Sequence, residues 1–401
     1  MTQKRIVFFS TPATGHLNAV YPVLARLVQK GMQIDWYCTE AYRPLVEATG
    51  ARFVPYRVDF SRYPLQKLTA DFYRLYQGLL ELNRRCYRRH RREIEENPPA
   101  LILYDSMCSF GKNLARKYAI PSICLCTTLA YNAPVVLCTS LLLPTVKLAV
   151  RHLPKLLRLY GEELRFRRRE GLARLNVLDL FVNAGDKTLV FTPRALQPFV
   201  FTFPSSFVFV GTTIRDRIAL TPTISYPPYD IYLSLGSIFS ENAERLEHIL
   251  SHPLFWQKKV IVSAGTAARK LRNSGRCAKL ACTAHTEQLS LLPKVGLFVN
   301  HGGLNSVYES LYFGIFQICL PQQEEQKLTA LLAQRKKFGL YVGEISRLKA
   351  AHVAKLQGAW QAEIRKYQRL LRACDGTARA CCEILKLLAS TGYFGKTDIS
   401  L

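Results

Sequence analysis

The chain has 401 residues, 49% of them hydrophobic, and a formal net charge of +26 at pH 7. This length exceeds what one hydrophobic core usually serves and predicts two domains, while the hydrophobic content excludes a disordered chain. The twelve cysteines lack the spacing of zinc sites or compact disulfide frameworks, so we expect reduced thiols in a cytoplasmic enzyme.

The first half of the chain alternates apolar runs with amphipathic stretches. Strands are predicted at 5–10, 33–39, 51–56, 99–106 and 121–128. Helical patterns separate most of these runs, beginning with one that ends at Gly31. This alternation predicts a doubly wound parallel sheet. The first run reads as a strand and not as an export signal, because it is short and no cleavage site follows it.

The longest uncharged stretch, 118–146, contains prolines at 121, 134 and 144. We interpret it as a buried strand followed by a pocket-lining loop rather than a membrane span.

Two arginine-rich runs, 84–92 and 165–169, carry much of the positive charge. Such runs could attract nucleic acid, anionic lipid or an acidic substrate. In the first run the arginines recur with a helical period and glutamates follow at once, so a solvated helix face is the simpler interpretation. Nucleic acid is not expected, because no zinc-finger spacing or aromatic RNA-binding motif accompanies the charge.

The same alternation of strands and helices begins again in the second half. Strands are predicted there at 230–237, 258–265, 296–303 and 316–322. The predicted domains are therefore 1–212 and 229–401, joined by a proline-containing linker at 213–228. The final helix is a candidate to pack back on the first domain. Ligands of doubly wound sheets bind beyond the carboxyl ends of the strands, and two such domains predict a cleft between them.

The motif HGGLNS begins where the strand at 296–300 ends and a helix starts. Gly302 and Gly303 leave backbone N–H groups accessible at the positive end of the helix dipole, which suits a diphosphate. His301, Asn305 and Ser306 add side-chain donors. The alternative is a plain tight turn in which Ser306 caps the helix.

Two further polar positions follow the motif. Glu309 lies one helical turn beyond Ser306 and can accept two hydrogen bonds from a vicinal diol such as ribose, although it could also be a surface glutamate. Glu325 and Gln326 follow the strand at 316–320, where a carboxylate and an amide can bind sugar hydroxyls. A polar loop or a helix start explains that pair equally well.

In the first domain, His16 lies at the turn after the first strand and Asp105 ends another strand of the same sheet. A neutral imidazole there can take a proton from a hydroxyl, and a carboxylate can orient it. The alternatives are a helix cap for His16 and a turn residue for Asp105.

Taken together, these segments resemble the two-Rossmann (GT-B) nucleotide-diphosphate-sugar glycosyltransferases. The resemblance is strongest to the bacterial macrolide branch of the UDP-glycosyltransferases. It covers nearly the whole chain, and it is carried by TPATGHLN, LILYDS, IYLSLGSIF, the HGGxNSxxE signature and LPQQEEQ. It implies an α/β fold of two Rossmann-like doubly wound domains that face a deep interdomain cleft. The domain 1–212 would bind the acceptor, and the domain 229–401 would bind the nucleotide sugar.

The resemblance also implies roles for individual residues. His16 would be the general base and Asp105 its partner. The nucleotide-sugar site would comprise Ser237 near the phosphates, Gln288 beside uracil and ribose, His301, Gly302, Gly303, Asn305 and Ser306 at the diphosphate, Glu309 at the ribose, and Glu325 and Gln326 at the donor sugar. No cofactor and no metal are implied, since the helix N-terminus and His301 would stabilise the leaving diphosphate.

Some positions depart from the family pattern. His285 stands where relatives often have an aromatic residue stacked on uracil, and Glu287 where they usually have proline. Phe316 and Ala19 replace prolines, and Glu325 is one methylene longer than the common aspartate. The changes at His285 and Glu287 leave the nucleotide open, and Glu325 leaves the sugar open. Neither proline replacement removes a catalytic atom.

The implied activity is an inverting transfer of a hexose, with glucose and UDP-glucose preferred, to a hydroxyl of a hydrophobic natural product. The apolar segment 130–150 and the aromatic segment 71–80 suit such an acceptor, and core packing explains them about as well. A second interpretation is a cytoplasmic enzyme that docks peripherally on an anionic membrane and glycosylates a lipid or sterol. A third is a catalytically silent sugar-nucleotide-binding partner subunit. The sequence does not give the oligomeric state.

Overall fold

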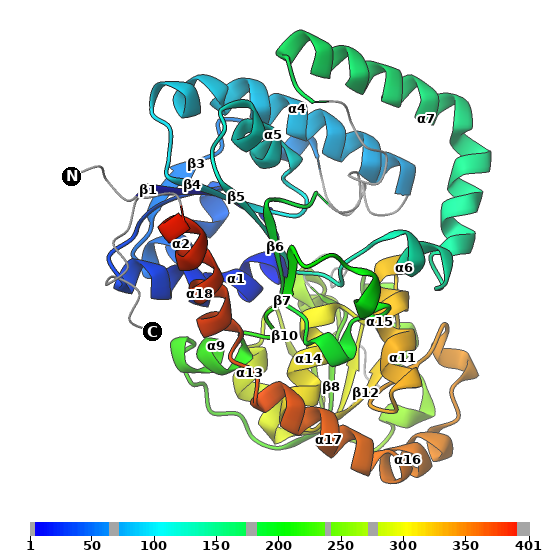
Figure 1. Ribbon diagram of the computed structural model, residues 1–401. Helices are drawn as coiled ribbons and strands as arrows, with labels where there is room; N and C mark the ends of the chain where they lie inside the picture. Colours follow the sequence, from blue (N-terminus) through cyan, green and yellow to red (C-terminus); the bar gives the residue numbers. More distant parts are fainter. Residues whose placement is uncertain (1–4, 64–71, 174–182, 237–241, 272–279, 391–401) are drawn as a thin grey trace. The chain divides into compact units, whose positions relative to one another are not determined.

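The computed structural model describes residues 5–63, 72–173, 183–236, 242–271 and 280–390. It divides into two compact units (Figure 1). Unit 1 comprises Met1–Thr213 with Asp375–Leu401, and unit 2 comprises Ile214–Cys374.

Unit 1 is built on a parallel seven-stranded sheet with the order β3-β2-β1-β4-β5-β6-β7. Its strands are β1 (Arg5–Phe9), β2 (Gln33–Cys38), β3 (Arg52–Pro55), β4 (Leu101–Asp105), β5 (Ser122–Cys126), β6 (Lys187–Val190) and β7 (Phe207–Phe209). The order turns back beside β1, so β1 and β4 lie next to each other and their carboxyl ends meet at one edge. The first five strands were predicted, whereas β6 and β7 were not, because four and three residues are too short to show a period.

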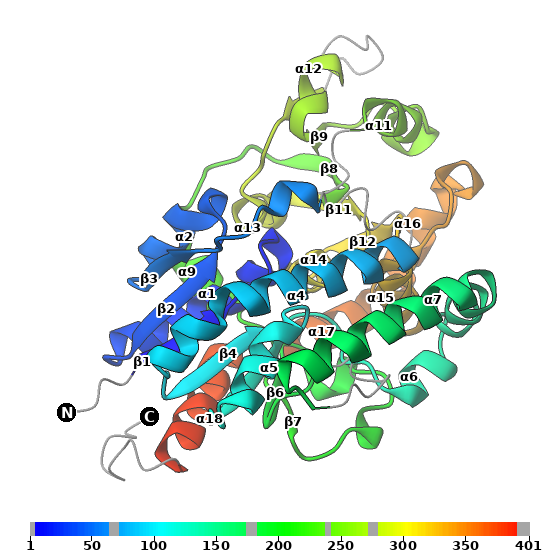
Figure 2. The ribbon, with the colours of Figure 1, turned by 90° about the horizontal axis from the view of Figure 1, so that it is seen from above.

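Helices cover both faces of this sheet (Figure 2). The helices of unit 1 are α1 (Thr14–Gln29), α2 (Arg43–Ala48), α4 (Phe72–Glu96), α5 (Ser109–Lys117), α6 (Ala133–Leu137), α7 (Leu142–Glu170) and α18 (Gly376–Ser390). Helix α7 packs against α4. Alternate residues of β1 point to opposite faces, as the pleat requires. Ile6 and Phe8 pack in one core with α1 and α18. Val7 and Phe9 pack in the other with α4 and α5.

The uncharged stretch 118–146 begins as predicted with a buried strand, β5. The prediction of a loop after it is wrong beyond residue 132, since α6 and the start of α7 follow. Pro134 lies in the first turn of α6, where its missing N–H costs no hydrogen bond. No helix in the described part of the chain is long and apolar enough to span a bilayer.

Unit 2 is built on a parallel six-stranded sheet with the order β10-β9-β8-β11-β12-β13. Its strands are β8 (Tyr229–Ser234), β9 (Val260–Ser263), β10 (Leu280–Thr283), β11 (Val295–Asn300), β12 (Phe316–Cys319) and β13 (Leu340–Tyr341). Its helices are α9 (Ile214–Leu220), α11 (Ala243–Leu250), α12 (Ala268–Leu271), α13 (Gln288–Leu291), α14 (Leu304–Phe313), α15 (Glu324–Arg335), α16 (Ala350–Ala359) and α17 (Gln361–Arg372). Both sheets have the predicted doubly wound α/β architecture.

The chain between the two sheets is more regular than the sequence analysis expected. Helix α9 occupies 214–220, inside the segment assigned to the linker, because the buried side chains of Ile214 and Arg217 anchor it. At the other end of the chain, α18 packs against α1. Its buried residues, including Ile384 and Leu388, complete one of the two cores of unit 1.

Candidate active site

His16 and Asp105 come together at the carboxyl edge of the unit 1 sheet. Asp105 is the last residue of β4, and His16 lies in the first turn of α1, just after β1. Because β1 and β4 are paired, both side chains reach the same place. Nδ1 of His16 lies 2.8 Å from Oδ2 of Asp105.

Asp105 is held as a carboxylate. The residue is 2% exposed, and burial alone would raise its pKa. The neighbouring His16, the backbone N–H of Met107 and the hydroxyl of Thr11 outweigh burial and lower the pKa of Asp105 below its usual value. Thr11 and Met107 donate to Oδ1 at 2.7 and 2.9 Å. The remaining oxygen is therefore directed at His16.

This contact sets which nitrogen of His16 carries the proton. A carboxylate accepts the Nδ1–H, which leaves the lone pair on Nε2. The side chain of His16 is 15% exposed, so it lies at the rim of the unit and not in its core. The arrangement can accept a proton at Nε2 and stabilise the resulting imidazolium.

Thr127 is a third member of this cluster that the sequence analysis missed as a site residue. Its Oγ1 lies 2.8 Å from Nδ1 of His16. The residue directly follows β5, the strand beside β4. The rule that selected Asp105, a polar residue at a strand's carboxyl end, applies equally to Thr127.

In unit 2, the turn between β11 and α14 is shaped by contacts within the chain. Oδ1 of the buried Asn300 accepts a hydrogen bond of 2.7 Å from the N–H of Gly302. Gly302 has φ of +80°, and a Cβ there would lie 2.8 Å from the carbonyl oxygen of Gln326. A Cβ on Gly303 would collide with the ring of His301. The two glycines thus have packing reasons in addition to ligand access.

The N-terminus of α14 begins at Gly303, which provides no side-chain cap. The turn therefore differs from the alternative in which Ser306 caps the helix. Asn305 and Ser306 lie in its first turn and are half-buried. Uncapped N–H groups at a helix start are a binding site for anions.

His301 is a neutral donor in this structure. Burial lowers its pKa to about 4, and only a backbone hydrogen bond at Ser234 acts in the opposite direction. The sequence analysis expected His301 to help stabilise a diphosphate. Near neutral pH it can do so as an N–H donor, and positive charge has to come from elsewhere.

Three predicted ligands, Gln288, Ser306 and Glu309, form one network. Nε2 of Gln288 donates to Oε2 of Glu309 at 2.6 Å and to Oγ of Ser306 at 3.4 Å. Glu309 is 2% exposed, so the alternative of a surface glutamate is wrong.

Arg217 of α9 forms an ion pair with the other carboxylate oxygen of Glu309. Its Nη1 donates to Oε1 at 2.6 Å, and both side chains are buried. The sequence analysis missed Arg217 because it placed this residue in the linker. A diol that binds Glu309 would share the carboxylate with a fixed cation.

Glu325 and Gln326 lie in the first turn of α15, so the alternative of a helix start is correct for their local structure. Gln326 is buried, and its Oε1 accepts a hydrogen bond of 2.9 Å from the backbone N–H of Gln322. Glu325 is half-buried. Ser237 lies outside the described residues.

Arg245 of α11 is a cation near the same loops that the sequence analysis did not select. Its Nη1 donates to Oε1 of Gln322 at 3.2 Å. The amide of Gln322 in turn donates to the carbonyl of Leu235, at the end of β8. Burial lowers the pKa of Arg245, and no carboxylate of the described ranges forms an ion pair with it. No motif marks this position, since it depends on how α11 packs.

The chain was compared with known protein families and with individual proteins, and it is similar to glycosyltransferases. Residues 231–350 match the model of the family described as "UDP-glucoronosyl and UDP-glucosyl transferase". The chain is 28% identical to NDP-glycosyltransferase YjiC of Bacillus licheniformis, covering 98% of this chain and all of that protein. It is 26% identical to NDP-glycosyltransferase YjiC of Bacillus subtilis, over 96% of this chain and 97% of that one. Residues 231–350 thus match the UDP-glycosyltransferase family, and the whole length of the chain is similar to bacterial NDP-glycosyltransferases.

Solved structures of glycosyltransferases have the same fold as this chain. The calicheamicin glycosyltransferase CalG4 matches 97% of the chain and 99% of its own with a TM-score of 0.79 and 22% identity. The glycosyltransferase VinC, solved in complex with dTDP, matches with a TM-score of 0.68 and 14% identity and covers 96% of this chain and all of its own. The chain therefore has the GT-B fold, as the resemblance implied. Within the described ranges, no three His, Cys, Asp or Glu side chains are grouped so that they could hold a metal ion.

Proposed function

We propose that this enzyme transfers a hexose, preferentially glucose, from a UDP-sugar to a hydroxyl of a hydrophobic small molecule, with inversion of configuration. The observation that carries the proposal is the contact between His16 and Asp105 at the carboxyl edge of a doubly wound sheet. The similarity to enzymes named NDP-glycosyltransferases supports the same class of reaction.

In the proposed reaction, Nε2 of His16 accepts the proton of the acceptor hydroxyl, and Asp105 stabilises the imidazolium. The acceptor oxygen attacks the anomeric carbon from the face opposite the nucleotide. The bond from that carbon to the diphosphate oxygen breaks, and its electron pair stays on the diphosphate. A single displacement of this kind inverts the anomeric configuration.

The donor would bind unit 2 at the network around α14. Gly302, Gly303, Asn305 and Ser306 would hold the diphosphate together with His301. Gln288 and Glu309 would bind the nucleoside, and Glu325 and Gln326 would bind the sugar. Arg245 would supply the positive charge that a neutral His301 lacks. No metal is needed in this scheme, because donors and a fixed cation surround the leaving group.

The decisive experiment compares the wild-type enzyme with His16→Ala, using UDP-glucose and a phenolic acceptor. General-base catalysis contributes roughly 10²–10⁴-fold, so we expect turnover to fall by about that factor while UDP-glucose affinity is unchanged. His248→Ala, which alters an exposed histidine of α11, is the matched control and should keep full turnover. Wild-type turnover in His16→Ala would refute the proposed base.

The donor nucleotide is tested by a thermal-shift panel of UDP-glucose, UDP-galactose, UDP-GlcNAc and dTDP-glucose. A ligand that binds only the folded state raises the melting temperature, and at equal concentration a tighter ligand raises it more. Glu309 binding to both ribose hydroxyls predicts that UDP-glucose gives a larger shift than dTDP-glucose, which lacks the 2′-hydroxyl.

Two alternatives lead to different outcomes. A silent partner subunit would bind UDP-glucose and form no product that depends on His16. A lipid or sterol acceptor is favoured by one observation, the exposed apolar side chains of α7. That acceptor would be recognised by turnover on acceptors presented in vesicles and none on water-soluble phenols.

A further inference from the structure

Helix α7 carries a continuous apolar row that faces solvent. Five side chains form the row, spaced three and four residues apart as on one face of a helix. Their exposed fractions are 61% for Leu143, 47% for Val146, 76% for Val150, 52% for Leu153 and 61% for Leu157. Aliphatic side chains this exposed are ordinary when scattered singly, but a contiguous row marks a surface that is covered in the working protein.

The row lies on the side of α7 that unit 1 does not use. Further along the helix, Leu159 and Phe166 are buried, and Phe166 belongs to the core under α4. Figures 1 and 2 show the long α7 beside α4 at the outside of unit 1. Pro154 lies inside the helix and is itself exposed. Packing within unit 1 therefore explains one side of α7 and leaves the apolar row unexplained.

Basic side chains run next to the apolar row. Lys147, Arg151, Lys155 and Arg158 are all exposed, and no acidic residue occurs between positions 142 and 161. At 100° per residue, these four positions fall on the flank beside the leucines and valines. A helix with an apolar face and Lys and Arg along its edge is typical of segments that lie in a membrane interface.

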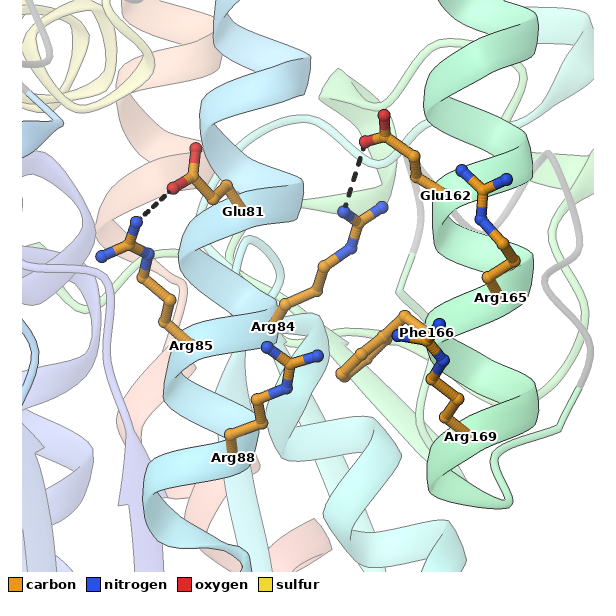
Figure 3. A pocket seen from close by; sticks show the side chains of 8 residues that line it. All are labelled: Glu81, Arg84, Arg85, Arg88, Glu162, Arg165, Phe166 and Arg169. Carbon is orange, nitrogen blue, oxygen red and sulfur yellow. Dashed lines mark hydrogen bonds and ion pairs between the residues drawn. The ribbon is translucent and has the colours of Figure 1, made fainter.

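The basic edge continues into a hollow of about 330 Å³ between α4 and α7 (Figure 3). Five arginines and two glutamates line it, so its wall is positive. The arginines are Arg84, Arg85 and Arg88 of α4 and Arg165 and Arg169 of α7. The two arginine-rich runs, which are far apart in the sequence, thus meet across one hollow.

The glutamates leave part of this charge uncompensated. Nε of Arg84 donates to Glu163 at 2.8 Å, whereas its Nη1 is 3.7 Å from Glu162. Nη2 of Arg84 is buried and has no hydrogen-bond partner among the described residues. A buried N–H group without a partner costs free energy, and a phosphate oxygen would satisfy it.

We propose that α7 docks this enzyme on an anionic lipid bilayer. The apolar row enters the boundary between headgroups and acyl chains, and the basic edge and the hollow between α4 and α7 bind lipid phosphates. A nucleic acid would use the charge but leave the apolar row in water, and the two features occur on the same helix. The helix lies on the membrane and does not span it.

The test is co-sedimentation of the full-length wild-type protein with vesicles, without donor or acceptor present. Vesicles of phosphatidylcholine alone are compared with vesicles that contain phosphatidylglycerol, at about 50 mM and about 500 mM salt. At low salt we expect at least tenfold tighter binding to the anionic vesicles than to the neutral ones. At high salt, weaker binding should remain, because the apolar row does not depend on charge. Because no substrate is involved, this result is independent of the proposed catalysis.

Two pairs of variants separate the apolar from the charged contribution. Val150→Asp with Leu153→Asp should abolish the salt-resistant binding, whereas Phe201→Asp with Leu220→Asp, two exposed apolar residues elsewhere, should not. Arg165→Glu with Arg169→Glu should weaken binding at low salt at least tenfold. Arg365→Glu with Arg369→Glu on α17 has the same spacing and the same charge change, and should have a much smaller effect.

Each remaining outcome overturns the proposal. Equal binding to neutral and anionic vesicles excludes recognition of anionic headgroups by the arginines. If the control pairs lose as much binding as the test pairs, the loss depends only on the net charge of the protein and not on α7. If the wild-type protein ignores vesicles and Val150→Asp with Leu153→Asp changes its sedimentation coefficient, the row is a contact between two copies of the chain. Melting curves of all variants confirm that each is folded.

Discussion

His301 lies at the centre of the unit 2 site and is kept neutral by its surroundings. Its ring contacts Gly236 and Gly303 so closely that no Cβ fits at either position. The partial burial of the ring lowers its pKa to about 4, well below the usual value of about 6.5. Between these two values the unfolded chain binds a proton that the folded enzyme excludes, so His301 reduces stability as pH falls through that window.

Binding of the donor should change this protonation state. A diphosphate beside the ring favours the charged imidazolium and raises the pKa of His301. We therefore expect the enzyme to take up protons when UDP-glucose binds. The uptake should be close to zero at pH 8 and should increase progressively toward pH 6. Calorimetry in buffers of different ionisation enthalpy measures this uptake. UDP-glucose is the appropriate ligand because its diphosphate, unlike that of UDP, has no group that titrates near pH 6.

The control for this prediction is His301→Gln, which keeps an N–H donor but cannot take a proton. Uptake of the same size in this variant would show that another group accounts for it.

At the scale of single residues, the sequence identified most of the candidate site and missed the residues that depend on packing. His16, Asp105, Gln288, Ser306 and Glu309 occur in recognisable motifs, and the structure brings them into two clusters. Their catalytic and binding roles stay predictions. Thr127, Arg217 and Arg245 occur in no motif, and their positions follow from neighbouring strands and helices that a pattern in one segment does not specify.

In the turn between β11 and α14, both the backbone conformation and a close contact require glycine. Gly302 combines φ of +80° with a backbone oxygen 2.8 Å from where a Cβ would stand. Gly302→Ala should therefore destabilise unit 2 by about 1–3 kcal/mol and weaken UDP-glucose binding, because the N–H groups of the turn move. Chemical denaturation and calorimetry measure the two effects.

Gly358→Ala is the matched substitution for this experiment. Gly358 lies in α16, where a Cβ meets nothing within 4 Å and φ is helical. Gly358→Ala should stabilise the protein by about 0.4–1 kcal/mol, because alanine reduces the conformational entropy of the unfolded chain. Equal effects of the two substitutions would contradict the account of the turn.

Most long elements could be predicted, because strands of five or six apolar residues and helices of ten or more show their period in the sequence. The short elements could not. β13 has two residues, and α9 has seven within a stretch whose prolines suggested an irregular linker. α7 was also missed, since Pro144 and Pro154 in its N-terminal part suggest an interrupted segment and not a continuous helix.

On the scale of the whole molecule, the two units are not two consecutive pieces of chain. Helix α18 belongs to unit 1, although all of unit 2 separates it from Thr213. The side chain of Ile384 is fully buried in the core that α1 and β1 form. Ile384→Ala should lower the free energy of unfolding of unit 1 by about 2–5 kcal/mol.

Chemical denaturation followed through Trp36, which is fully buried in the same core, measures this loss. Lys386→Ala on the exposed side of α18 should change stability by less than about 0.5 kcal/mol. A small effect of Ile384→Ala would mean that α18 only rests on unit 1 and does not complete its core.

The return of α18 to unit 1 also has a consequence for biosynthesis. A ribosome releases the first 213 residues long before it makes residues 376–390, so the apolar side of α1 stays bare while the whole of unit 2 is being translated. The nascent N-terminal portion therefore cannot reach its final stability ahead of the rest, as an N-terminal domain ordinarily does. Chaperones that shield hydrophobic surface would be needed during that interval, and truncated products ending before α18 should be prone to aggregate.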